Sequence, residues 1–369
     1  MMKKIRLCDV CDFQGGSQPP KNQWISENRD GYIRMLQIRD FTQSEKVMPE
    51  YIKISNSIKT CREDDILIAR YGASVGKILT GLSGAYNVAI MKTIPDEKVI
   101  SRKYLFYFLS SEYFQNLITN VGSRAAQAGF NKDDLYKVMI TERSLEEQNT
   151  ICRLLDSVTE QITNRKEELK LLDELVKSRF IEFFGTYPTN EKGWNTGNIR
   201  DVVSEVSYGS SRPAVDGGRY PYLRMNNITY GGELDLSDTK RIDIPDNELT
   251  KCTVRRGDVL FNRTNSKELV GKTCVYNRDE MMVLAGFVIR VRVNEKVLPE
   301  FLSAFLNTDF SKKMLLGMCK TAIGQANINA QELQNIGLYI PPIDLQQEFV
   351  DFKTQVDKSK HYGELEAAA

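Results

Sequence analysis

The chain has 369 residues, long enough for two domains of about 150 residues each and a connecting helix. Its 50 basic and 49 acidic residues leave a net charge of +1, which excludes a uniformly basic nucleic-acid-binding protein and makes the local placement of charge decisive. The single histidine, His361, excludes Ser-His-Asp and Cys-His catalytic devices and histidine metal clusters within the body of the chain.

Other patterns argue against a membrane, secreted or catalytic protein. No apolar run approaches the roughly 18 residues that cross a bilayer, and the N-terminus lacks the apolar stretch of a signal peptide. Seven cysteines without disulfide spacing fit a reducing compartment, so we expect a cytoplasmic protein with no membrane partner. Cys8 and Cys11 form a lone C-x-x-C without the second pair of a zinc site, so we expect no metal. Neither a phosphate-binding loop nor an N-P-P-[YF] methyltransferase segment occurs.

Residues 1–144 predict a first α+β domain. Two acidic residues precede the apolar run Ile66–Ala69, which ends at Arg70 and is typical of a buried strand. Arg102–Leu117 places apolar and aromatic residues at i, i+3 and i+4, which predicts helix. Short strands, Gly-rich turns and one or two helices indicate a compact domain with short-stranded mixed sheets.

Residues 145–185 predict a long central helix that acts as a spacer. Proline and glycine are absent from Leu145 to Phe183, and Gly185 and Pro188 mark the end. Apolar residues follow the spacing of a coiled-coil seam over about five heptads, with Arg165 and Arg179 as polar exceptions. The apolar seam positions are Ile151, Leu155, Val158, Ile162, Leu169, Leu172, Val176 and Phe183.

Residues 186–342 repeat the first domain with its motifs in the same order. The matched segments are IRLCDV and IRDVVS, YIRMLQIRDF and YPYLRMNNIT, DDILIAR and GDVLFNR, YLFYFLSSEYFQ and FLSAFLNTDFSK, and AQAGFNKDDLYKVMI and GQANINAQELQNIGLYI. The offset between the copies drifts only from about 194 to about 198 residues, which indicates a duplicated domain rather than a solenoid repeat.

Residues 343–362 predict a second helix that pairs with the first. Phe349, Phe352 and Val356 continue the seam spacing, and PIDLQQEF at this helix start matches SLEEQNTI at the start of the central helix. We therefore expect an antiparallel coiled coil with the domains at opposite ends. Residues 363–369 form a tail, either a frayed end or a cloning scar, and carry no fold argument.

Three loops in each domain carry the residue types that contact DNA. Base edges are read by Arg, Lys, Asn and Gln, whereas Lys, Arg, Ser and backbone N–H groups hold phosphates. The loops are Gln14–Lys21, Arg70–Lys77 and Gly122–Asn131 in the first domain, and Tyr208–Arg212, Arg263–Lys272 and Lys320–Asn329 in the second. The candidate DNA-binding residues are Arg70, Ser74, Lys77, Arg124, Gln127, Arg212, Arg263, Asn265, Lys267, Lys272, Lys320 and Gln325.

Comparison of the copies divides these candidates. If the two copies read different base sequences, the base readers are the candidates that differ between the copies, namely Ser74, Arg124, Asn265 and Lys267. Residues that recur favour a shared role, so Gln127 and Gln325 either contact phosphate or staple a loop. Arg70 and Arg263 either contact DNA or pair with a carboxylate inside each domain. Gly76 and Gly271 are expected to be turn glycines.

The domain duplication, Leu145–Gln148 and Pro341–Gln346 at the helix starts, and the DILIAR…VGK and DVLFNR…VGK segments resemble the specificity subunit of type I restriction–modification systems. The resemblance covers essentially the whole chain. It implies two target recognition domains, each reading half of a bipartite double-stranded DNA site, and helices that fix the spacer and dock two methyltransferase subunits. Those partners would bring S-adenosylmethionine, and restriction subunits would bring ATP-dependent translocation and cleavage, so this chain would hold no cofactor and no catalytic residues.

Two other classes of function stay open. One is a stand-alone DNA-binding or scaffold protein that uses the long helix to organise partners. The other is a restriction–modification enzyme with its own catalytic centre, which would need a cofactor motif or an acid cluster with a catalytic lysine that the sequence does not provide.

Overall fold

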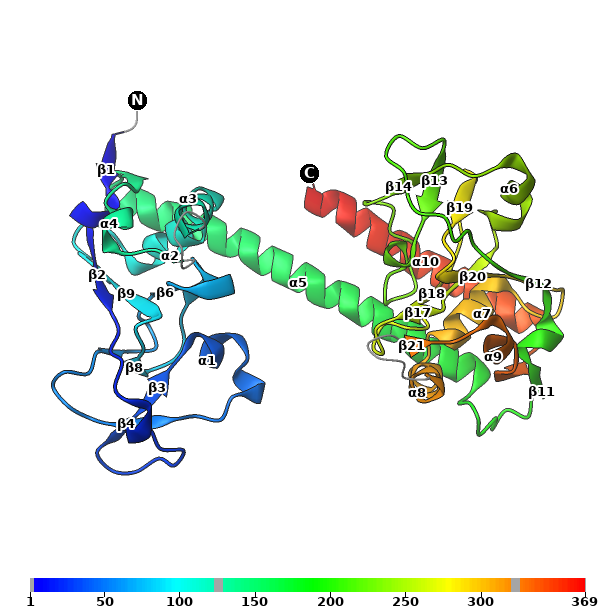
Figure 1. Ribbon diagram of the computed structural model, residues 1–369, viewed down its shortest axis with the longest axis horizontal. Helices are drawn as coiled ribbons and strands as arrows, with labels where there is room; N and C mark the ends of the chain where they lie inside the picture. The colour runs from blue at the N-terminus through cyan, green and yellow to red at the C-terminus, as the bar shows by residue number, and fades with distance from the viewer. Residues whose placement is uncertain (1–2, 123–128, 320–325, 369) are drawn as a thin grey trace. The chain divides into compact units, whose positions relative to one another are not determined.

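The computed structural model describes residues 3–122, 129–319 and 326–368, and it divides into two compact units, Met1–Gln161 and Ile162–Ala369. Each unit is an α+β domain, and the long helix α5 (Leu145–Phe184) contributes to both (Figure 1). The boundary between the units falls inside this helix.

The first unit contains two four-stranded sheets and one short pair. The strand orders are β2-β9-β6-β7, β4-β3-β8-β5 and β1-β10. The strands are β1 (Lys4–Arg6), β2 (Cys11–Gly15), β3 (Tyr32–Leu36), β4 (Tyr51–Lys53), β5 (Thr60–Cys61), β6 (Leu67–Ala69), β7 (Ile78–Leu79), β8 (Gly84–Tyr86), β9 (Ile90–Pro95) and β10 (Met139–Thr141). The helices are α1 (Ile38–Thr42), α2 (Arg102–Ser110), α3 (Glu112–Gly122) and α4 (Lys132–Leu135).

The second unit repeats this topology strand for strand. Its sheets run β12-β20-β16-β18, β14-β13-β19-β15 and β11-β22, with an added pair β17-β21. The strands are β11 (Asn195–Asn198), β12 (Val203–Tyr208), β13 (Tyr220–Leu223), β14 (Lys240–Ile242), β15 (Thr253–Val254), β16 (Val259–Asn262), β17 (Thr264–Asn265), β18 (Thr273–Val275), β19 (Met282–Leu284), β20 (Val288–Val293), β21 (Ala326–Asn327) and β22 (Gly337–Ile340). The helices are α6 (Asp246–Cys252), α7 (Pro299–Leu306), α8 (Asp309–Met318), α9 (Ala330–Gln334) and α10 (Ile343–Ala368). The predicted fold class and duplication are confirmed.

The same local chemistry forms the central strand in both copies. Before β6 the Asp65 carboxylate accepts a hydrogen bond from the Arg62 amide at 2.9 Å, and before β16 Asp258 accepts one from the Arg255 amide at the same distance. The amides of Asp65 and Asp258 donate in return to the carbonyls of Arg62 (3.2 Å) and Arg255 (3.0 Å), so each aspartate closes a turn before its strand. The strands that follow are completely buried, because helices cover one face of each main sheet and side chains of the second sheet cover the other.

Two buried glutamines at matching positions join each long helix to its domain. Gln148 on α5 accepts a hydrogen bond from the Ser101 amide (2.8 Å) and donates to the Val99 carbonyl (2.7 Å). Gln346 on α10 accepts from the Leu298 amide (2.8 Å) and donates to the Lys296 carbonyl (3.1 Å). Each side chain therefore ties the start of a long helix to the segment that leads into α2 or α7.

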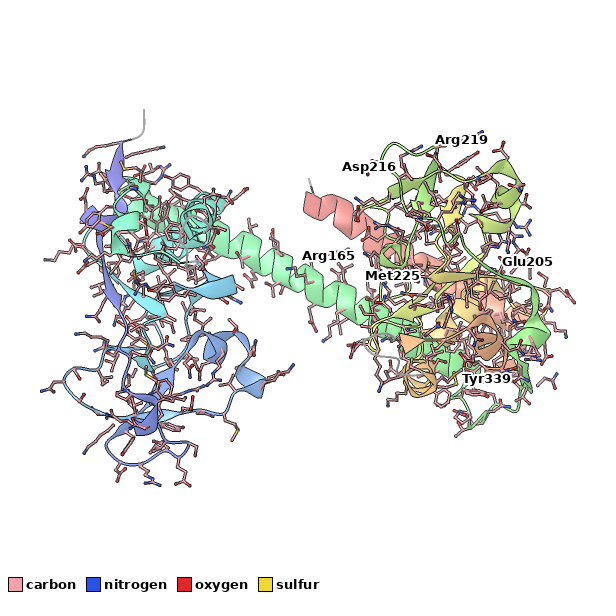
Figure 2. All side chains as sticks on the ribbon, viewed as in Figure 1. Arg165, Glu205, Asp216, Arg219, Met225 and Tyr339 are labelled. Atoms are coloured by element: carbon pink, nitrogen blue, oxygen red, sulfur yellow. The ribbon has the colours of Figure 1, made fainter. Side chains whose placement is uncertain are left out.

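Helix α10 packs antiparallel along the C-terminal half of α5. Arg165, labelled in Figure 2, donates to the carbonyls of Ser359 and Lys360, whereas the Phe180 ring lies 5.3 Å from that of Phe349 near the start of α10. The predicted antiparallel pairing is confirmed. The second helix was expected to end at residue 362, and α10 continues to Ala368.

The predicted seam is covered along only part of α5. From residue 165 to 183 its members are half-buried, but Leu155, Val158 and Ile162 are exposed. The prediction of a continuous seam of five heptads was wrong for this part, because α10 has 26 residues and α5 has 40. Gly185 ends α5 as expected, with a φ of 81° that favours glycine.

Within the described ranges, no helix is long and apolar enough to span a membrane, and no three His, Cys, Asp or Glu side chains group as metal ligands.

Candidate nucleic-acid interface

In each unit the loop after the buried central strand is closed in the same way. In the first unit the Gly76 amide donates to the Ala69 carbonyl (2.9 Å) and the Ala69 amide donates to the Lys77 carbonyl (2.9 Å). In the second unit Gly271, Asn262 and Lys272 form the same two bonds at 2.8 Å. Both glycines have positive φ, 82° and 79°, so their predicted role in a turn is confirmed. We call residues 70–76 and 263–271 the recognition hairpins.

The third predicted loop meets the recognition hairpin in both units. The Phe130 amide donates to the Arg70 carbonyl at 3.3 Å, and the Ile328 amide donates to the Arg263 carbonyl at 2.9 Å. In the second unit β17 and β21 extend this contact through the paired residues Thr264 and Asn327. Loops that are distant in sequence are therefore neighbours, as a shared binding surface requires.

The first predicted loop joins the same cluster in the second unit. The Tyr208 ring lies 4.9 Å from the Arg263 guanidinium, and the Tyr208 hydroxyl accepts a hydrogen bond from the Ala330 amide at 2.9 Å. One tyrosine thus contacts Arg263 of the second predicted loop and Ala330, the first residue after the third. Sequence patterns marked Tyr208 only as the boundary of a loop and gave no sign of its stacking role.

The two strand-end arginines differ in what holds them. Arg70 donates to the carbonyls of Phe130 and Val88, both at 3.3 Å, so its guanidinium links two separate segments of the first unit. Arg263 has a buried Nε without a partner, and no hydrogen bond of its guanidinium occurs within the described ranges. In the same part of the chain, neither arginine forms the carboxylate pair considered as the alternative. Arg70 therefore uses two of its donors within the first unit, whereas the described residues accept none of the guanidinium donors of Arg263.

The other candidates on and beside the hairpins are accessible to different degrees. Lys77 and Lys267 are exposed, and Ser74 and Asn265 are half-buried. The Asn265 side-chain oxygen accepts from the Ser266 amide at 2.8 Å, which leaves its NH₂ group to donate elsewhere. All four side chains are therefore at least partly accessible to solvent.

Two candidates have internal partners instead. Lys272 is only 7% exposed, and its ammonium donates at 2.8 Å to the carbonyl of Met225, which Figure 2 labels. Burial lowers the pKa of Lys272. Arg212 forms a two-point ion pair with Glu248 that raises the pKa of this arginine (Nη2 to Oε1 2.7 Å). The two lysines of the repeated V-G-K motif therefore differ in environment: Lys77 faces solvent, whereas Lys272 is buried and supports the fold.

Arg124, Gln127, Lys320 and Gln325 lie outside the described residues.

Two side chains outside the predicted loops support the recognition hairpins. Gln115 on α3 donates to the Gly76 carbonyl at 2.9 Å, and Lys312 on α8 donates to the Gly271 carbonyl at 2.8 Å. They are the last residues of the matched segments YLFYFLSSEYFQ and FLSAFLNTDFSK. The alignment of the two segments shows that Gln115 and Lys312 occupy equivalent positions. A shared role for a glutamine and a lysine becomes clear only when the structure shows that both donate to the carbonyl of the loop-closing glycine.

Comparison with known protein families identifies both copies. The profile described as "Type I restriction modification DNA specificity domain" matches residues 1–173 and 191–367, nearly the whole chain. The chain belongs to this family. The predicted family is thereby confirmed, and each match covers one copy together with part of the long helix that follows it.

Curated members of the specificity family extend along most of the chain. The EcoKI specificity subunit of Escherichia coli K12 is 22% identical over 89% of this chain and 76% of that protein. The MjaVIII specificity subunit of Methanocaldococcus jannaschii is 21% identical over 96% of this chain and 85% of that protein.

Solved structures from this specificity family share the fold. A type I restriction–modification S subunit from M. genitalium superposes with a TM-score of 0.53 at 12% identity, covering 100% of this chain and 92% of that one. A chain from a study of complex assembly in the type I R-M system gives 0.59 at 18% identity, covering 99% and 92%. At these identities the likeness concerns the fold alone.

Proposed function

We propose that this chain is the non-catalytic DNA-recognition subunit of a type I restriction–modification complex, and that each unit reads one half of a bipartite double-stranded DNA site. The observation that carries the proposal is the duplicated loop cluster in a chain of the specificity family, since both units bring together a recognition hairpin and the third loop. The names of these curated relatives, both specificity subunits, support a role in recognition rather than catalysis.

The residues on and beside the hairpins divide into those that contact bases and those that contact phosphates or support the loops. Arg263, Asn265 and Lys267 carry the donors that recognise guanine and adenine in the major groove. Ser74 and Arg124 are the proposed readers of the first half-site, and Lys77 is proposed to hold a phosphate. Arg70 and Lys272 support the loops and leave the reading to their neighbours.

The exposed apolar residues of α5 support docking of methyltransferase subunits. Leu154 and Val158 are 64% and 51% exposed and one helical turn apart, and Leu171 and Leu175 form a second such pair. Two pairs fit the proposed two methyltransferase subunits, which would supply S-adenosylmethionine, while restriction subunits would supply ATP-driven cleavage. The complex would work in the cytoplasm, and this chain would bind neither cofactor.

The test is methylation mapping by long-read sequencing in a methylation-free host that expresses the chain with its genomic methyltransferase. A methylated motif in two parts with a fixed gap would support the proposal and reveal both half-sites. A continuous motif would mean that only one unit reads DNA. No methylation, with both proteins soluble and associated, would favour the scaffold function.

A further inference from the structure

We propose that Gln115 and Lys312 are positioning residues that hold the recognition hairpins in their DNA-binding shape by fixing the carbonyl of the loop-closing glycine. The inference rests on the proposed function, because it assigns these side chains a role in DNA recognition. It makes Lys312 a support for the hairpin rather than a phosphate ligand.

The two glycines lie against equivalent helices in the two units. A Cβ added to Gly76 would meet the Gln115 Oε1 atom at 3.0 Å and the Ile118 side chain at 3.4 Å. A Cβ added to Gly271 would meet the Leu315 side chain at 2.7 Å. Ile118 and Leu315 each lie three residues after the positioning residue, so α3 and α8 present the same surface to the hairpin. The helices approach closely because both positions are glycine.

The positioning bond connects the loop-closing glycine to a helix. The glycine amide and the following residue's carbonyl already close the loop from within. The glycine carbonyl instead accepts from α3 or α8, which fixes the hairpin relative to the domain. The Gly271 carbonyl also accepts from the nearby Thr273 hydroxyl at 3.1 Å. Gln115 also donates to the Leu109 carbonyl at 2.7 Å, so its amide bridges the hairpin and the end of α2.

Lys312 is poorly suited to a phosphate contact. Its ammonium lies 5.4 Å from the Tyr230 ring and donates to Gly271. Burial, with the positive charges of Lys177 and Lys272 nearby, lowers the pKa of Lys312 to about 8. Asp309 on the same helix pairs with Lys177 at 3.6 Å. A group that is partly neutral near pH 8 is a weak counterion for DNA, but it donates a hydrogen bond in either state.

The test transfers the glutamine of the first unit into the second unit as a rescue. In the full chain with its methyltransferase partner, Lys312→Gln should keep binding to the mapped site within about twofold, because glutamine makes this bond in the first unit. Lys312→Met removes the donor and should weaken binding about tenfold, with lost discrimination in the second half-site only. Lys313→Gln, which removes an exposed charge next to Lys312, controls for charge alone.

The outcomes separate this proposal from the proposed function. If the unaltered chain directs no methylation, the proposed function fails, and this result does not depend on the variants. If it does, equal losses for Lys312→Gln and Lys312→Met with a reduced salt slope would show a phosphate contact and overturn the positioning role. Unaltered binding of Lys312→Met would also overturn it. Gln115→Leu provides an independent check, because it should reduce discrimination in the first half-site and leave the second unchanged.

Discussion

At the scale of single residues, equivalent positions in the two copies have taken different roles, and Arg70 and Arg263 show this most directly. Arg70→Gln breaks two 3.3 Å bonds to the carbonyls of Phe130 and Val88, so it should lower the free energy of unfolding by about 1–2 kcal/mol. Arg263→Gln breaks no hydrogen bond seen among the described residues and should instead weaken binding of the second half-site by about 1–3 kcal/mol. Urea denaturation and DNA titration of both variants measure the two effects. The opposite pattern, with Arg263→Gln unstable and Arg70→Gln defective in binding, would contradict the assignment.

The lowered pKa of Lys312 gives a second residue-scale prediction. Its pKa is about 8 in the folded protein against an ordinary 10.5, so the unfolded chain holds more protons between these values. The contribution of Lys312 to the free energy of unfolding should therefore rise with pH in this window and be constant below it. Raising the pH from about 7.5 to about 9.5 should stabilise the unaltered chain relative to Lys312→Gln.

The measurement needs a signal from the second unit alone. Trp24 and Trp194 are the two tryptophans, one in each unit, so Trp24→Phe leaves Trp194 as the reporter. Burial raises the pKa of Cys274 to about 12, so the stability linked to this thiol falls as the pH rises. This contribution is the same in both proteins, and it cancels when they are compared at each pH. A pH-independent difference between the two proteins would disprove the linkage.

At the scale of secondary-structure elements, the buried glutamines make the helix starts part of the domains. Gln346 is completely buried and bonds the Leu298 amide and the carbonyls of Lys296 and Pro341. Gln346→Met should lower the free energy of unfolding of the second unit by about 2–4 kcal/mol, because it leaves buried groups without partners. Gln347→Met, at the exposed neighbouring position, is the control. Trp194 fluorescence in urea measures the free energy of unfolding of both variants. Equal small decreases for the two variants would contradict a stabilising role for the Gln346 hydrogen bonds.

The apolar face of α5 carries the other prediction at this scale. Leu154→Gln with Val158→Gln removes exposed apolar surface only, so the free energy of unfolding should change by less than about 0.5 kcal/mol. Association with the methyltransferase should nevertheless fall, from two subunits to one in native mass spectrometry. Glu160→Gln with Asn164→Gln changes exposed polar positions with the same spacing and should leave the stoichiometry unchanged. If the apolar pair can be replaced without loss of a subunit, the docking surface lies elsewhere.

At the scale of the whole molecule, sequence patterns predicted the duplicated α+β domains and the antiparallel pairing of α5 and α10. These features were predictable because repeated motifs and the heptad spacing of apolar residues indicate which positions are buried. They could not show that Lys77 is exposed and Lys272 buried, although both follow Val-Gly. That difference depends on a carbonyl of Met225, far away in the chain, and such contacts leave no local signal. Gln115 and Lys312 were missed for the same reason.

The continuity of α5 leads to a prediction about the target itself. No proline or glycine interrupts Leu145–Phe184, and a helix of this kind is stiff enough to set a distance. Glu160 is exposed, so Glu160→Pro should kink the helix, at a cost of about 3 kcal/mol to helix stability, while leaving both domain cores intact. Methylation mapping should then show the two half-sites with a gap that is no longer fixed, or reduced methylation with the methyltransferase still associated.

Glu160→Ala removes the same carboxylate and keeps the helix, so it should preserve the gap found for the unaltered chain. This pair of variants separates the stiffness of α5 from its surface charge. An unchanged, fixed gap in Glu160→Pro would mean that the spacing is set by the partner subunits rather than by α5. A variable gap in Glu160→Pro alone would assign the spacing to the unbroken backbone of this one helix.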